Sequence, residues 1–147
     1  APSGKVYQAG TFSGNPISVI AGLATLKTIK NKGEVFYQEL EYKRLLLCDA
    51  IRDFIEDNNY PVQVNDIASM FQVFFSQNEV YDYETAKKVV KEKFMNFHRK
   101  LLKKDVFFPP SQFETCFISA AHSKEDIEET VVGICDSIAC TIERLSK

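Results

Sequence analysis

Apolar residues recur at helical spacing just after a polar opening loop. From Pro16 to Ile29 they return every three or four positions, and Asn15 and Pro16 are typical N-cap and first-turn residues. The sequence Asn31-Lys32-Gly33 is a typical helix stop. These signals predict a first helix that begins next to a loop over residues 1–14.

Three further stretches have a helical period. A second amphipathic helix is predicted over about residues 34–57, before the breaker sequence Asn-Asn-Tyr-Pro. A third is predicted over 84–104, with one basic and one apolar face, and a fourth over 124–145. Ser123 and Asp126 resemble a capping box at the start of the fourth.

Short β-like segments separate the second, third and fourth helices. Residues 62–64 alternate, 70–75 form an apolar run, and 106–108 and 116–121 flank a Pro-Pro turn. Helices and strands in this order predict an α+β fold: a small, mainly antiparallel sheet of three to four strands covered by helices. We expect a boundary near residue 30, with loop and first helix over 1–33 and a domain with its own core over 34–147.

Composition narrows the possible functions. The chain has 147 residues, 45% of them hydrophobic and 26% charged, with a formal net charge of -2. Dispersed basic residues argue against nucleic-acid binding, and no apolar run is long enough to span a membrane. The four cysteines lack C-x-x-C spacing, so we expect no metal site and buried free thiols of a cytoplasmic protein. His98 is expected at the surface, and His122 at the border of the last helix.

The loop QAGTFSGNP at residues 8–16 has the composition of an anion site. Gly10 and Gly14 let backbone N–H groups approach an oxyanion, and Thr11 and Ser13 add hydroxyl donors. A glycine-rich connector before a capped helix is the alternative interpretation. The P-loop pattern is absent.

The amino-acid sequences of several segments resemble those of one enzyme family. VYQAGTFSGNP with AGLATL, ASMFQVFF at 68–75, FHRKLLKKDVFFPPSQFET at 97–115 and AAHSKEDIEETV at 120–131 resemble the class III pyridoxal-phosphate-dependent aminotransferases. Within that family, the PPSQFE and AHSxEDI motifs are similar to motifs of the glutamate-1-semialdehyde 2,1-aminomutases. The resemblance covers nearly the whole chain and places it in the C-terminal portion of such an enzyme. Ala68 and Asp105 stand where the family pattern leads us to expect glycine, so the resemblance does not determine the turn conformation at these two positions.

The resemblance implies roles for three residues. Gly10 and Thr11 match a Gly-Thr pair that binds the phosphate of the cofactor, pyridoxal 5'-phosphate or pyridoxamine 5'-phosphate, across the interface of a homodimer. Glu114 matches a glutamate near the bound substrate, with a solvated turn residue as the alternative. Asn15 and Pro16 are expected to start the helix.

The resemblance also implies what the chain lacks. The Schiff-base lysine of the family lies upstream of the Gly-Thr pair, and Lys5, Lys27 and Lys30 do not match it. The full-length enzyme would convert the small molecule glutamate-1-semialdehyde to 5-aminolevulinate, a tetrapyrrole precursor, through a diamino intermediate. This segment alone is expected to be inactive. Another class III transaminase and a non-catalytic α+β association module remain alternatives.

Overall fold

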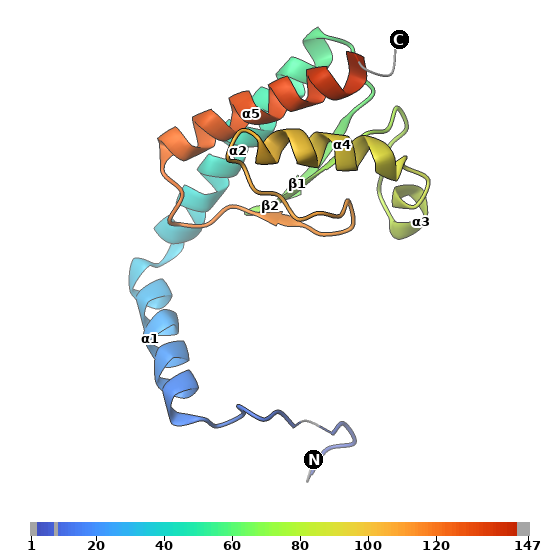
Figure 1. The fold of residues 1–147 in the computed structure, drawn as a ribbon. Coiled ribbons are helices and arrows are strands. Elements are labelled where there is room, and N and C mark those ends of the chain that lie inside the picture. Colours follow the sequence, from blue (N-terminus) through green and yellow to red (C-terminus); the bar gives the residue numbers. More distant parts are fainter. Residues whose placement is uncertain (1–2, 8, 144–147) are drawn as a thin grey trace. The chain divides into compact units, whose positions relative to one another are not determined.

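The computed structural model describes residues 3–7 and 9–143 (Figure 1). Its backbone contacts divide the chain into two compact units, Ala1–Phe36 and Tyr37–Lys147. The predicted end of the last helix, residues 144 and 145, lies outside the described residues.

The first unit holds helix α1 (Pro16–Lys32), whose two ends are the predicted ones. The Asn15 side chain accepts hydrogen bonds from the N–H groups of Ile17 and Ser18, at 3.1 and 3.2 Å. At the other end, Gly33 has a φ of 63° and donates its N–H to the carbonyl of Ile29. None of the α1 residues is buried, although many are apolar.

The second unit is built on a three-stranded antiparallel sheet in the order β1 (Gln63–Ile67), β2 (Met70–Phe74) and β3 (Cys116–Phe117). The register pairs Ile67 with Met70, which leaves Ala68 and Ser69 as a two-residue hairpin loop. Ala68 has a φ of 52°, because such loops need a left-handed residue at this place. This sheet and its helices confirm the predicted α+β fold.

Helices α2 (Glu34–Asp57), α4 (Lys91–Leu102) and α5 (Lys124–Glu143) supply the rest of the core. We call the sheet face with Phe71, Val73 and Cys116 the inner face, since these side chains are buried in the core. The inner face also carries Asp66, which forms ion pairs with Arg44 and Arg52 of α2. We call the opposite face, with Gln63, Asn65, Gln72, Phe74 and Phe117, the outer face.

The predicted third helix is wrong as a continuous element. It consists of α3 (Tyr83–Ala86), started by a capping box of Asp82 and Thr85, and the separate α4. The main-chain carbonyls of Ala86 and Val89 accept hydrogen bonds from the side chain of Gln112, at 3.0 and 3.3 Å. Gln112, which lies outside residues 84–104, therefore bonds to two carbonyls that would accept N–H groups within a continuous helix.

The predicted strand at 106–108 is also wrong, because its backbone bonds to α4. Asp105 has a φ of 59°, and the Val106 N–H donates to the carbonyl of Leu101 at 3.1 Å, which ends α4 in a Schellman motif. Phe108 then packs its ring edge-on against Phe71 and Phe97. The strand predicted at 116–121 is only two residues long.

Two expectations about burial need correction. His98 is only 6% exposed rather than a surface residue, and its Nε2 lies 3.0 Å from the carbonyl oxygen of Phe108. All four thiols are free, but only Cys48 and Cys116 are buried; Cys135 is half-buried and Cys140 exposed. Burial raises the pKa of both Cys48 and Cys116 to about 12.

Candidate functional site

The loop before α1 is folded into two consecutive turns. The Ser13 N–H donates to the carbonyl of Gly10 at 2.9 Å, and the Asn15 N–H to that of Phe12 at 3.0 Å. A Cβ at position 10 would lie 2.9 Å from Ser13 Oγ, and Gly14 has a φ of +76°. The positive φ of Gly14 favours glycine there, whereas a side chain at position 10 would require the Ser13 hydroxyl to move.

This loop keeps several donors free. Among the residues that the structure describes, the N–H and hydroxyl of Thr11 and the hydroxyl of Ser13 have no hydrogen-bond partner. The N–H groups of Ile17 and Ser18 at the start of α1 are occupied by the Asn15 side chain. The loop itself, beside the positive end of the helix dipole, thus offers the donors that an oxyanion needs.

Glu114 ends a turn that follows Pro109 and Pro110. Its N–H donates to the carbonyl of Ser111 at 3.1 Å, and the Ser111 hydroxyl accepts from the N–H of Phe113. The Glu114 side chain is exposed and makes no ion pair with any described residue. Its carboxylate is therefore available to a ligand.

Two buried glutamines hold this turn in place. The amide of Gln72 on β2 donates to the carbonyls of Gln112, at 3.1 Å, and of Glu114. The amide of Gln112 in turn donates to the carbonyls of Ala86 and Val89. The role of Gln72 was not predicted from the sequence. A single amide inside the apolar run MFQVFF does indicate such a role, because a buried polar side chain needs hydrogen-bond partners.

A hollow of about 280 Å³ adjoins the turn on the outer face of the sheet. Its wall includes Glu114 and Gln112 with the aromatic residues Tyr81, Tyr83 and Phe113. The rings of Tyr83 and Phe113 lie 5.7 Å apart. Phe113 lines this hollow, whereas Phe108 is buried in the core and Phe107 lies beside His98.

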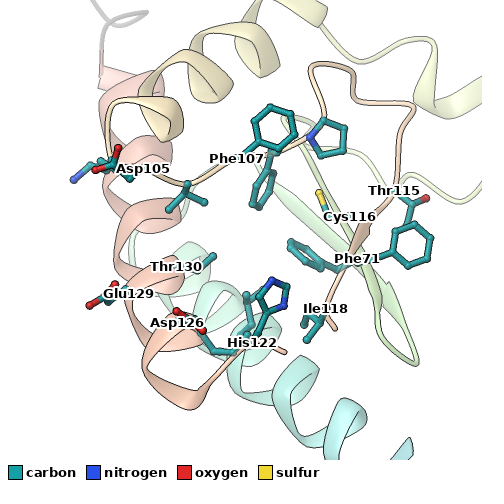
Figure 2. A pocket seen from close by; sticks show the side chains of 17 residues that line it. Phe71, Asp105, Phe107, Thr115, Cys116, Ile118, His122, Asp126, Glu129 and Thr130 are labelled. Carbon is teal, nitrogen blue, oxygen red and sulfur yellow. The ribbon is translucent and has the colours of Figure 1, made fainter. Parts of the chain in front are cut away.

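A larger hollow, of about 590 Å³, lies beside β3 (Figure 2). Figure 2 shows Phe71, Cys116 and Ile118 on its sheet side, with His122 and Asp126 at the start of α5. The Nδ1 atom of His122 accepts a hydrogen bond from the N–H of Ser119 at 3.1 Å, which agrees with its expected place at the border of the last helix. Sequence reasoning did not predict this hollow.

The predicted site residues fall in different units. Gly10 and Thr11 belong to Ala1–Phe36, whereas Glu114 belongs to Tyr37–Lys147. Within residues 3–7 and 9–143, no cluster of His, Cys, Asp and Glu could hold a metal ion. In the same residues, no helix has the length and apolar character needed to cross a membrane.

Curated relatives match almost the whole chain. It is 46% identical over 136 residues to a glutamate-1-semialdehyde 2,1-aminomutase of Methanocaldococcus jannaschii, a match that covers 92% of the chain and 31% of that protein. A protein of the same name from Nitrosopumilus maritimus is 48% identical over 131 residues, covering 89% of the chain and 31% of that protein. The chain thus spans about a third of the length of these relatives. No protein-family model matches the sequence.

Solved structures share the fold. A β-phenylalanine aminotransferase from Variovorax paradoxus matches with a TM-score of 0.76 and 20% identity, over 95% of this chain and 31% of that one. An ω-transaminase from Sphaerobacter thermophilus matches with a TM-score of 0.73 and 17% identity, over 92% and 30%. At these identities the likeness concerns the fold alone. The sequence matches identify the chain as a homologue of the C-terminal part of glutamate-1-semialdehyde 2,1-aminomutases.

Proposed function

We propose that the chain is the C-terminal part of an enzyme that converts glutamate-1-semialdehyde to 5-aminolevulinate. The observation that carries this proposal is the 46–48% identity, over about nine tenths of the chain, to relatives named for the aminomutase reaction. Since the chain spans 31% of those relatives, the activity is that of a longer protein. The free thiols are in keeping with a cytoplasmic location.

The loop of the first unit fits the phosphate of pyridoxal or pyridoxamine 5'-phosphate. Thr11 supplies a free N–H and a free hydroxyl, and Ser13 supplies a second hydroxyl. A Cβ at position 10 would lie 2.9 Å from that hydroxyl, so glycine leaves space for it. When bound, the cofactor would supply the amino group that the reaction exchanges between neighbouring carbons. The residues of this chain would orient it through its phosphate.

We assign the phosphate contact to the partner's cofactor in a homodimer. In that arrangement Gly10 and Thr11 of one copy meet a phosphate that the other copy holds. The structure supports this role through the exposure of both residues and the free donors of Thr11. A helix with apolar residues on all sides is normally buried, so α1 also suits a place inside a larger assembly.

We place Glu114 close to the substrate. Its free carboxylate and the neighbouring Tyr81 and Tyr83 would form one wall of the site. A wall of this kind excludes water and keeps a diamino intermediate from escaping. Glu114 would act there as a hydrogen-bond or charge partner for an amino group.

The test is an assay of the full-length protein that carries this chain. Conversion of glutamate-1-semialdehyde to 5-aminolevulinate without any added amino acceptor supports the proposal. Amine transfer only to a separate oxo acid would show an ordinary class III transaminase instead. Absence of both turnover and cofactor binding would favour the association module.

Thr11→Val tests the phosphate contact in the same protein. Loss of a hydrogen bond to a charged group is worth about 1.5–3 kcal/mol, so the cofactor should bind roughly 10- to 100-fold more weakly. Absorbance titration measures this affinity. Thr28→Val is the matched control, because the Thr28 hydroxyl only bonds to the carbonyl of Ala24 within α1. Equal affinities for all three proteins would rule out the assigned contact.

A further inference from the structure

The turn that carries Glu114 is held from the centre of the sheet. Gln72 lies in the middle of β2 and is 7% exposed. Its Nε2 donates to the Gln112 carbonyl at 3.1 Å and to the Glu114 carbonyl, and it lies 3.5 Å from the carbonyl oxygen of Ser111. Its Oε1 accepts from the N–H of Val73 at 3.0 Å, which fixes the orientation of the amide.

A second tie holds the same turn from the other side. Gln112 is 3% exposed, and its amide donates to the carbonyls of Ala86, at the end of α3, and of Val89, just before α4. Asn65, which faces Gln72 across the β1–β2 ladder, donates to the carbonyl of Val80 in the neighbouring loop. Side-chain amides thus connect the Glu114 turn and the loop before α3 to the same two strands.

The geometry points to Gln72 as a positioning residue for Glu114. Because the Glu114 carbonyl is bonded to the Gln72 amide, its main chain is fixed while its carboxylate stays exposed. Reactions of precisely oriented groups are sensitive to small displacements, and about 1 Å can cost on the order of 100-fold in rate. The inference rests on the proposed substrate-facing role of Glu114.

Gln72→Met in the full-length protein tests this role. The change keeps the size of the side chain and removes the amide, so the carbonyls of Gln112 and Glu114 lose their donor. Amide hydrogen exchange of residues 111–115 should become at least about 10-fold faster, while α2 and α5 remain protected. Gln63→Met is the matched control, since Gln63 lies on the same outer face and its side chain makes no hydrogen bond with a described residue.

The activity measurement separates positioning from general damage. Gln72→Met should lower kcat about 10- to 100-fold in the wild-type background, but less than about 3-fold when Glu114→Gln is already present. Equal losses in both backgrounds, or a Glu114→Gln variant with wild-type activity, would overturn the inference. Unchanged exchange of residues 111–115 would also overturn it.

Failure of the proposed function and failure of the variant to fold can both be told apart from failure of the inference about Gln72. If the wild-type full-length protein fails to convert glutamate-1-semialdehyde, the proposed function fails, and the exchange experiment still decides whether Gln72 orders the turn. If Gln72→Met does not fold, Gln72→Asn replaces it, because the shorter amide stays polar but falls short of the turn. An ordered turn in that variant would contradict the inference.

Discussion

His98 and Phe108 are joined by a buried hydrogen bond, with Nε2 of the imidazole 3.0 Å from the main-chain carbonyl oxygen. A carbonyl only accepts, so Nε2 carries the proton. The bond pins the extended segment after α4 to that helix, and Phe108 inserts its ring between Phe71 and Phe97. His98 is thus a structural residue of the core.

His98→Ala should therefore destabilise the protein by about 2–4 kcal/mol, because it opens a cavity and leaves the carbonyl of Phe108 without a partner. Equilibrium unfolding in urea measures the change. His122→Ala serves as the control, since His122 is exposed and should cost less than about 1 kcal/mol. Equal effects of the two substitutions would refute the assigned role of His98.

Ala68 and Asp105 have left-handed backbones, with φ of 52° and 59°. A side chain in this conformation costs roughly 1–2 kcal/mol, and less for Asp, whereas glycine adopts it freely. Ala68→Gly should therefore stabilise the protein by about 0.5–1 kcal/mol after the larger entropy of the unfolded glycine chain is subtracted. Asp105→Gly should stabilise it by a smaller amount.

Chemical denaturation of both variants checks the prediction, with Ala50→Gly in the middle of α2 as the control. The same exchange of alanine for glycine inside a helix should destabilise the protein by about 1 kcal/mol. A loss of stability for Ala68→Gly comparable to that of Ala50→Gly would contradict the assigned geometry of the hairpin.

The stability that Asp126 contributes at the start of α5 depends on pH. Its carboxylate accepts the backbone N–H of Ser123 at 2.7 Å, and this bond, with that of the Ser123 hydroxyl, lowers the pKa of Asp126 below its ordinary 3.8. A lowered folded-state pKa means that the stabilisation is present above the unfolded pKa and is lost as the pH falls through the folded one.

Asp126→Asn should accordingly lower the midpoint temperature of unfolding at neutral pH, and the difference should vanish at acidic pH, well below about pH 4. Thermal unfolding across this range measures it. Asp53→Asn on the exposed side of α2 is the control, because Asp53 has no hydrogen-bond partner among the described residues. A difference that persists unchanged in acid would exclude the carboxylate as its source.

The features that the sequence predicted correctly are governed by neighbouring residues. Asn15 and Gly33 bound α1, and Ser123 with Asp126 starts α5, because each cap is made within a few residues of the helix end. The left-handed positions at Ala68 and Asp105 agree with the glycines that the family resemblance suggested there.

The errors arise where distant residues decide the local structure. Gln112 follows Ala86 by 26 residues and takes its carbonyl, so the period of the intervening residues could not reveal the break before α4. Similarly, a short apolar segment at 106–108 was predicted to be a strand, whereas its bonds to Leu101 and His98 attach it to helix α4. The outer-face role of Gln72 depends on a turn some 40 residues away.

Helix α1 has a practical consequence for anyone who prepares this protein. Its apolar side chains are uncovered: Ile17 is 80% exposed, Ile20 68% and Leu26 67%. A sample of the 147-residue chain should self-associate at high concentration through this helix, and detergent or dilution should reverse it. Trimming the gene so that translation begins near Tyr37 should give a monodisperse preparation that retains the sheet and its core.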